Sequence, residues 1–432
     1  MTVSNSSTVV IKPPRTISGS VRLPGDKSIS HRYAMLGAIA EGTTRLQNFS
    51  TGADCASTLG CLQSLGVKIE REGNSVVIHG RGPKLETPTG PLDCGNSGST
   101  MRMLSGILAG QPFTSDLIGD ASLSRRPMAR IISPLRTMGA QISAKDDRPP
   151  LSIIGGNLKA IHYKIPVASA QVKSSLLFAG LFAEGETRLA ESVRTRDHGE
   201  LALRAFGAVV TIHNKQTGIQ GGQALQAIET TVPGDISSAA FFLCAAALFP
   251  DSQLTITDLG LNPTRSYLLD LLAGMGLHIS VTQIEEKHGE LMGTLQAQGA
   301  TLRGATIASP HTEMLIDEIP VLAAIAPYTQ QGIEIRDAKE LRVKESDRLA
   351  AIATNLRAMG AEVEERSDGL RIPGNQRLHA AGLDAFGDHR IAMAFSIAAL
   401  RAEGETTIRG ADSAVISYPE FFETLESLAQ RR

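Results

Sequence analysis

Apolar and polar positions along this chain form two recurring patterns. The first is a short amphipathic helix that ends in an apolar residue and a glycine and is followed by a strand-like stretch. It occurs at 61–70, 135–143, 203–212, 272–281 and 356–365, and 421–430 is a shortened sixth copy. Glycine at this point permits the left-handed backbone with which many helices end. The pattern therefore predicts a reversal from helix to strand at each copy.

The second pattern is a helix that is apolar nearly all round and is followed by a turn and a strand. It occupies 33–49, 101–119, 175–191, 239–259, 321–335 and 391–410. A helix without a polar face is expected to be buried. The two patterns alternate at a spacing of roughly 70 to 85 residues, which is typical of a repeat-built fold. The alternation favours six α/β units over chance similarity among helix ends.

The length of the chain favours two domains of three units each. A chain of 432 residues is too long for one ordinary core. We place domain I at 1–20 plus 235–432 and domain II at 21–234, with the chain crossing between them near 18–23 and 232–236. The segment VPGDISS introduces the fourth unit at the second crossing.

Composition excludes several classes of function. The formal net charge is −2, whereas a nucleic-acid binder usually shows a basic excess. The N-terminus lacks an apolar signal core and no 18-residue apolar window occurs, so we expect no membrane partner and a cytoplasmic protein. The four cysteines form no CxxC pair and indicate free thiols, and no metal-ligand spacing is present. An anion site in this chain must therefore be a local cluster of Arg and Lys.

Two stretches in the first third of the chain are candidate anion sites. Lys27, Ser28 and Arg32 stand at the start of an apolar helix, which Asp26 or Ser28 can cap. Backbone N–H groups and the helix dipole favour an anion there. The glycine-rich segment 94–102 offers backbone amides near Asn96 and Gly98, with Ser99 or Thr100 as caps, but lacks the ending of a Walker A loop. A capped surface helix and a plain tight turn are the simpler alternatives.

Three further stretches in the same half carry polar or basic side chains. Arg125 and Arg126 precede Pro127, which can open a helix, and an arginine pair can clamp a carboxylate or phosphate. Two solvated arginines on a loop are the alternative. Ser169, Gln171 and Lys173 lead into another apolar helix and suit a polyol. Arg196 and His198 follow in the sequence TRDHGE, and we interpret His198 as a structural hydrogen-bonding group.

The last third of the chain combines carboxylates with basic residues. Asp317 and Glu318 stand before an apolar helix. Lys344 and Arg348 are interpreted as one helical turn apart, and Glu345, Asp347 or a bound anion would offset their repulsion. Asp388, His389 and Arg390 precede another apolar helix. We expect the basic residues at the starts of the buried helices to form an anion-attracting cleft, although a solvated charged helix face is the usual alternative.

Taken in order, these stretches resemble the EPSP synthases from about Ile17 to Glu423. The motifs are GDKSISHR, GNSGSTMR, SRRP, SAQVKSS, RDHGE, RVKESDRL and DHRIAMAF, and GDKS, SAQVK, RDHGE and NPTR suggest the class II branch. Gly199 departs from that branch, in which Ser or Thr is usual. Ser417 precedes Tyr418-Pro419 where another branch carries a lysine, so that lysine contact is not carried over.

The resemblance implies a fold and a reaction. The fold is the two-domain enolpyruvyl transferase fold, an inside-out α/β barrel type with three units per domain closing over a cleft at the hinge. The reaction transfers the enolpyruvyl group of phosphoenolpyruvate to the 5-hydroxyl of shikimate 3-phosphate through a tetrahedral intermediate, in the shikimate pathway to aromatic amino acids. It implies no cofactor, no metal and no nucleic acid, and we expect a monomer. The family's inhibitor glyphosate is expected to act at the phosphoenolpyruvate site beside Gly98.

The resemblance also implies a role for each matching residue. Asp317 would take the proton of the substrate hydroxyl, Glu345 would act as acid and base at the methylene carbon, and Lys27 would touch both substrates. The shikimate 3-phosphate contacts would be Lys27, Ser28, Arg32, Ser169, Ala170, Gln171, Arg196, Asp317 and Lys344. The phosphoenolpyruvate contacts would be Lys27, Asn96, Gly98, Arg126, Gln171, Arg348 and Arg390.

Two other functions are weighed against this one. The sister transferase that acts on UDP-N-acetylglucosamine has a Lys-Asn pair near its start, where this chain has Lys27-Ser28. That family also carries a reactive Cys in the loop before its Arg-Pro, whereas this chain has no Cys in 119–126. A repeat-built anion-binding protein without catalysis is the second alternative. Asp317 and Glu345 count against it, because bare carboxylates would weaken a cleft that only binds anions.

Overall fold

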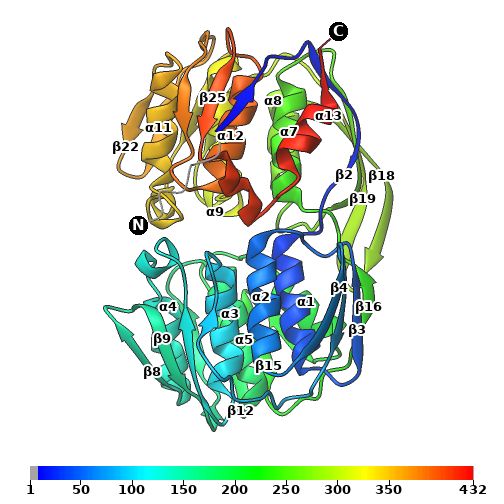
Figure 1. Cartoon of the computed structure of the whole chain (residues 1–432), viewed down its shortest axis with the longest axis vertical. Helices are drawn as coiled ribbons and strands as arrows, with labels where there is room; N and C mark the ends of the chain where they lie inside the picture. The colour runs from blue at the N-terminus through cyan, green and yellow to red at the C-terminus, as the bar shows by residue number, and fades with distance from the viewer. Residues whose placement is uncertain (1–7, 432) are drawn as a thin grey trace. The chain divides into compact units, whose positions relative to one another are not determined.

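The computed structural model describes residues 8–431, which fold into two compact units. Unit 1 combines the chain up to Pro24 with Pro233–Glu285 and the chain from Leu291 onward. Unit 2 consists of Gly25–Val232 together with the short segment Glu286–Glu290. Each unit has its own apolar core. The helices and strands of each unit are labelled in Figure 1.

Unit 2 contains three four-stranded sheets of identical design. In each, the first strand pairs in parallel with the second, and the other two pairings are antiparallel. The orders are β16(Glu229–Thr231)-β3(Thr43–Gln47)-β5(Ser75–His79)-β4(Lys68–Glu72), β6(Leu92–Asp93)-β7(Thr114–Ile118)-β9(Arg148–Ile154)-β8(Gln141–Lys145) and β11(His162–Ile165)-β13(Glu186–Glu191)-β15(Gln216–Gln220)-β14(Val210–His213). Two short strands, β10(Leu158–Lys159) and β12(Ala183–Glu184), form a separate parallel pair.

Unit 1 has one four-stranded sheet with the same pairing, one sheet of five strands and one of three, and both ends of the chain contribute strands. Its sheets are β20(Ala305–Ile307)-β21(Ile333–Ile335)-β23(Gly369–Ile372)-β22(Glu364–Arg366), β18(His278–Lys287)-β19(Glu290–Gln298)-β17(Gln253–Gly260)-β2(Thr16–Arg22)-β26(Ala429–Gln430) and β1(Thr8–Ile11)-β25(Thr406–Arg409)-β24(Gly382–Asp384). The N-terminal strand β1 supplies the antiparallel partner of β25. The sixth sheet is thus completed by residues from the opposite end of the chain.

Six helices have buried residues on all sides, as the second sequence pattern predicts. They are α1(Lys27–Ile39), α3(Gly98–Ala109) and α5(Ala170–Phe182) in unit 2, and α7(Ile236–Ala247), α10(Ile319–Ile325) and α12(His389–Ala399) in unit 1. In Figure 1, α3 and α5 lie side by side within unit 2, and α2 is drawn between α3 and α1. The predicted burial of the six apolar helices is confirmed.

The helices of the first sequence pattern are α2(Ala53–Ser64), α4(Ala129–Met138), α6(His198–Ala205), α8(Tyr267–Met275), α11(Arg348–Ala358) and α13(Phe421–Leu428). The one-turn helix α9(His311–Met314) belongs to neither pattern. The glycines that follow the first five are left-handed, with φ of 82°, 117°, 90°, 118° and 88° at Gly66, Gly139, Gly207, Gly276 and Gly360. The predicted helix-to-strand reversals are confirmed at these five positions. The sixth copy, α13, leads into the two-residue strand β26.

Three local expectations about helix starts are corrected. Ser97, and neither Ser99 nor Thr100, caps α3 by accepting a hydrogen bond from the Thr100 amide. Pro127 does not open a helix, because α4 starts two residues later at Ala129. Lys344 lies outside α11, in an extended conformation, because Asp347 caps that helix and Arg348 is its first residue. In α3 and α11 a side chain that accepts a hydrogen bond from a free amide fixes the helix start, whereas α4 begins without a side-chain cap.

Candidate active site

Side-chain hydrogen bonds hold the starts of α1, α3 and α5 together in unit 2. Gln171 at the start of α5 donates to Ser99 Oγ on α3 at 2.8 Å. Arg32 on α1 donates from Nε to Ser174 Oγ on α5 at 3.0 Å, and also to the Ala170 carbonyl at 3.4 Å. Three helix N-termini, each with free N–H groups and a positive dipole end, therefore meet in one region of unit 2.

The glycine-rich segment before α3 is lined by two arginines. Arg126 donates to Asn96 Oδ1 at 2.6 Å, and the Asn96 amide donates to Asp120 at 2.7 Å. A methyl group on Gly98 would lie 2.9 Å from Arg102 Nη1 and 3.3 Å from Arg126 Nη1. A side chain at this position would therefore require the two guanidinium groups to shift. Arg102 also donates to Gln171 at 2.8 Å, so this arginine, which we did not assign to the site from the sequence, belongs to the cluster.

A second basic pair consists of Arg32 on α1 and Arg196 on the loop before α6. Arg32 is buried and donates to the Ser28 carbonyl at 2.8 Å. Burial lowers the pKa of Arg32 to about 10, with Glu200 and Asp26 opposing and the positive charge of Arg196 adding to the shift. Arg32 and Arg196 are thus within electrostatic reach of each other. Two positive charges that repel each other in one region favour the binding of an anion there.

Lys27 stands at the first position of α1, where Asp26 caps the helix through the Ile29 amide at 2.9 Å. Its ammonium group lies 2.8 Å from Asp54 on α2. Asp54 is another residue that we did not assign to the site from the sequence. Since Asp54 was separated from Lys27 by 27 positions, only packing of α1 on α2 reveals the pair.

Unit 1 presents a buried arginine surrounded by three carboxylates. Arg348 is 1% exposed and donates to Asp388 from Nε at 2.8 Å and from Nη2 at 3.2 Å. It also pairs with Glu345 at 2.6 Å and lies 3.8 Å from Asp317. Burial alone would lower the pKa of Arg348, but Asp388, Glu345 and Asp317 together raise it above its ordinary value. Arg348 therefore remains a cation and fixes the positions of two predicted catalytic carboxylates.

Asp317 lies between two arginines. Arg390 donates to the backbone carbonyl of Asp317 at 2.7 Å, and its Nε is 3.9 Å from the carboxylate. Asp388 caps α12 by accepting from the Arg390 amide at 2.9 Å while it also binds Arg348. One carboxylate thus sets the positions of both arginines. The sequence did not assign Asp388 this role.

The residue after Asp317 belongs to a separate buried network. Glu318 accepts a short hydrogen bond from Ser237 Oγ on α7 and lies 3.3 Å from Arg265 Nη2. Arg265 also donates to Ser237 at 2.6 Å. Arg265 comes from the NPTR stretch, which served only as a branch marker in the sequence. In the structure it contacts Glu318, the residue between Asp317 and the start of α10.

Other predicted residues have different positions. Arg125 is exposed, so the structure shows no clamp made by Arg125 together with Arg126. Lys173 is buried and paired with two carboxylates, so it is not one of the cations lining an anion site. Lys344 is half-buried directly before Glu345, and Ser169 caps α5 through the Val172 amide at 3.4 Å. Asp347 pairs with Arg342 at 2.8 Å, and of the two carboxylates considered from the sequence it is Glu345 that pairs with Arg348.

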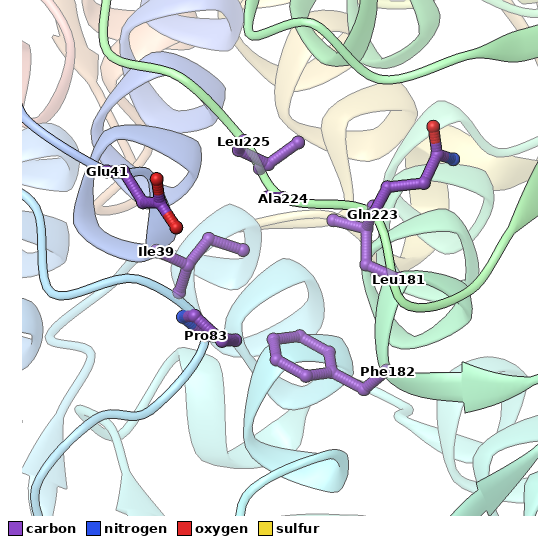
Figure 2. Close-up of a pocket in the computed structure, with 8 residues that line it drawn as sticks. All are labelled: Ile39, Glu41, Pro83, Leu181, Phe182, Gln223, Ala224 and Leu225. Carbon is purple, nitrogen blue, oxygen red and sulfur yellow. The ribbon is translucent and has the colours of Figure 1, made fainter.

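A small hollow in unit 2 lies away from these residues. Figure 2 shows that it is bordered by Ile39, where α1 ends, and by Leu181 and Phe182, where α5 ends. Its lining is mostly apolar and includes none of the predicted site residues. It lies at the ends of α1 and α5 opposite to the starts that carry Lys27 and Gln171.

The described residues contain no His, Cys, Asp or Glu grouping that could hold a metal ion. Within residues 8–431, no helix is long and apolar enough to cross a membrane. The four cysteines are free and buried, as expected from the sequence.

The fold defines a class of protein. The chain superimposes on the crystal structure of the enolpyruvyl transferase NikO from Streptomyces tendae with a TM-score of 0.80 at 20% identity, covering 98% of each chain. At this identity the likeness establishes the fold, and it is the enolpyruvyl transferase fold expected from the sequence.

Closer relatives identify the family within that class. The family described as EPSP synthase (3-phosphoshikimate 1-carboxyvinyltransferase) matches residues 11–425. A 3-phosphoshikimate 1-carboxyvinyltransferase of Koribacter versatilis (strain Ellin345) is 59% identical over 424 residues, covering 98% of this chain and 99% of the relative. The structure of EPSP synthase from Acinetobacter baumannii matches with a TM-score of 0.87 at 42% identity, covering 98% of each chain. The chain belongs to the EPSP synthase family, and the two alternatives considered from the sequence are not favoured.

Proposed function

We propose that this chain transfers the enolpyruvyl group of phosphoenolpyruvate to the 5-hydroxyl of shikimate 3-phosphate and releases phosphate. The observation that supports this best is that two carboxylates, Asp317 and Glu345, flank one buried guanidinium group, that of Arg348. Such a pair can divide the work, one accepting a proton while the other donates one. An anion-binding protein without catalysis has no use for this arrangement.

The carboxylates have distinct roles in the proposed addition and elimination. Asp317 takes the proton of the 5-hydroxyl as that oxygen forms a bond to C2 of phosphoenolpyruvate. Glu345 gives a proton to the methylene carbon, C3, and a tetrahedral intermediate results. Glu345 then takes a proton back from C3 as the bond from C2 to the phosphate oxygen breaks. The products are the enol ether and inorganic phosphate, which leaves with the proton that Asp317 took from the hydroxyl, so both carboxylates return to their starting states and no redox change occurs.

The basic residues would offset the charge of two polyanionic substrates. Each substrate carries a phosphate and a carboxylate, which arginines bind in bidentate fashion. We assign Lys27, Ser28, Arg32, Ser169, Ala170, Gln171, Arg196, Asp317 and Lys344 to shikimate 3-phosphate. We assign Lys27, Asn96, Gly98, Arg126, Gln171, Arg348 and Arg390 to phosphoenolpyruvate, and the position of Arg102 beside Gly98 supports adding it to this set.

The proposal extends to the setting of the enzyme. We propose a cytoplasmic enzyme without a membrane partner, and the formal net charge of −2, with no basic excess, supports the absence of a nucleic-acid partner. We propose a monomer, for which light scattering should give a mass near 45.7 kDa.

Phosphate release from phosphoenolpyruvate tests the reaction directly. We expect release with shikimate 3-phosphate as acceptor and none with UDP-N-acetylglucosamine. Release that requires the UDP-sugar would assign the chain to the sister transferase. Release with neither acceptor, together with retained binding of both anions, would favour the non-catalytic alternative.

Glu345→Gln tests the acid–base assignment. The amide keeps a hydrogen-bond acceptor for Arg348 but cannot exchange a proton, so we expect kcat to fall by about 100-fold or more. Affinity for shikimate 3-phosphate should stay within about threefold, since uniform binding is retained. Glu403→Gln changes an exposed glutamate and should leave kcat unchanged. Turnover of the Glu345 variant within about twofold of the parent would remove Glu345 from the mechanism.

A further inference from the structure

Lys173 is a buried cation that the proposed mechanism does not use. It lies in the first turns of α5 and is 1% exposed. Its ammonium group is 2.9 Å from Glu191 Oε2 and 2.7 Å from Glu200 Oε1. The two carboxylates are also almost fully buried, at 4% and 3% exposure. We call these three residues the Lys173 cluster.

Stability alone does not explain why the Lys173 cluster buries three charges. Removing three charges from water costs several kcal/mol per ion, and apolar residues of similar volume often stabilise a core equally well. Removal of the cation alone would leave two buried carboxylates facing each other, which is strongly unfavourable. The geometry of the cluster is therefore strictly constrained, and the segments that carry Glu191 and Glu200 are constrained with it.

Those two segments flank a loop with a predicted site residue. Glu191 is the last residue of β13 and Glu200 lies in the first turn of α6, so residues 192–197 connect them. Arg196 is on this connection. Thr195, its neighbour, donates a short hydrogen bond to Glu191 Oε1, the oxygen that Lys173 does not contact. Arg194 adds a contact to Asp197 Oδ2 at 2.9 Å. Both ends and the middle of the loop are thus tied to the cluster.

The same cluster is connected to Arg32. Ser174, the residue after Lys173, accepts the hydrogen bond from Arg32 Nε at 3.0 Å. Among the nearby carboxylates, Glu200 does most to raise the pKa of Arg32. Arg32 is therefore linked to the Lys173 cluster through Ser174, and Arg196 through its neighbour Thr195, which binds Glu191.

We propose that the Lys173 cluster is a positioning device that holds Arg196 and Arg32 in the arrangement that binds the phosphate group of shikimate 3-phosphate. Lys173 touches no substrate in this proposal and acts through the loop 192–197 and through α5. The inference rests on the proposed function, because it assigns the basic pair to that substrate. It predicts a defect in the binding of one substrate and not of the other.

Lys173→Met is the informative substitution, because methionine keeps the length of the side chain and removes the charge. We expect the KM for shikimate 3-phosphate to rise about tenfold or more, since misplaced guanidinium groups lose charge-assisted hydrogen bonds. The KM for phosphoenolpyruvate and kcat at saturation should change less than about threefold, because neither Asp317 nor Arg126 is displaced. Lys173→Arg should recover most of the lost affinity by restoring the cation.

Leu177→Ala is the matched control for a loss of stability. Leu177 is fully buried on the same helix, one turn further on, and takes no part in the cluster. This variant should lower the melting temperature while leaving both KM values unchanged. If Lys173→Met does not fold, Glu191→Gln serves instead, because Lys173 then keeps Glu200 and only one end of the loop is released.

The outcomes separate this inference from the proposed function. A folded Lys173→Met variant whose KM for shikimate 3-phosphate is unchanged within about twofold would overturn the positioning role. Equal losses for both substrates and in the Leu177 control would also overturn it, since they indicate a purely structural residue. Absence of turnover in the parent protein with shikimate 3-phosphate would instead refute the proposed function.

Discussion

His31 on α1 is connected to α2 and α3 through a chain of buried hydroxyl groups. Its Nδ1 is 2.7 Å from Thr58 Oγ1 on α2, and Thr58 is 2.7 Å from Thr100 Oγ1 on α3. His31 itself is fully buried on α1, beside Lys27 and Arg32. Its Nε2 has no hydrogen-bond partner among the described residues. Burial, with the positive charges of Lys27 and Arg32, lowers the pKa of His31 well below its ordinary value of 6.5.

This histidine should make stability depend on pH. Above pH 6.5 it is neutral in both the folded and the unfolded chain and contributes no pH dependence. Below that pH the unfolded chain binds a proton that the folded chain excludes, so the free energy of unfolding falls by up to about 1.4 kcal/mol per pH unit. His31→Asn should remove this part of the slope in urea unfolding series between about pH 7.5 and pH 5.

The exposed residue His162 provides the control for His31. His162→Asn should leave the slope as it is in the parent chain. An unchanged slope in the His31 variant would mean that this histidine is protonated in the folded chain.

At the scale of the element, capping side chains fix the starts of α3 and α12. Ser97 caps α3 and is fully buried, and the Thr100 hydroxyl also donates to it at 2.8 Å. Asp388 caps α12 and binds Arg348. The starts of these helices are therefore fixed by tertiary contacts as well as by local ones.

Ser97→Ala should destabilise the protein through α3. It leaves the Thr100 amide without its cap, for which we expect a loss of about 1 to 2 kcal/mol in the free energy of unfolding. Ser64→Ala on α2 changes an exposed serine and should stay within about 0.5 kcal/mol of the parent. Equal effects of the two substitutions in chemical denaturation would show that the cap contributes nothing.

At the scale of the whole molecule, unit 1 is assembled from both ends of the chain. β2 pairs with β26 near the C-terminus, and β1 pairs with β25. The last helix, α13, inserts Phe421 among aromatic rings, with centroids 5.6 Å from both Phe241 and Phe242. The core of unit 1 is therefore incomplete until the C-terminal segment is in place.

Phe421→Ala tests this closure. Phe421 is fully buried, so its truncation should cost about 3 to 5 kcal/mol of unfolding free energy through lost burial and a cavity. Phe422→Ala, at the partly buried neighbour, should cost clearly less. Similar losses for both, measured by urea unfolding, would mean that α13 docks loosely on unit 1.

The sequence by itself determined the repeated elements, because their signals are local. An apolar helix such as 236–247 and a glycine such as Gly139 after an amphipathic helix have a period or a backbone requirement that neighbouring residues already express. The order of the motifs was sufficient to identify the family. The catalytic and binding roles followed from that resemblance and remain predictions.

Tertiary structure alone decided which charges are partners. Lys173 was read as one more cation for an anion site, yet packing of α5 against β13 and α6 places it between Glu191 and Glu200. Asp388 was read as a charge before a helix, yet it binds Arg348, 40 positions away in the sequence. A sequence states the sign of each charge but not its burial or its nearest opposite charge. Those depend on how distant elements pack, because the strength of an ionic contact is set by distance and local dielectric.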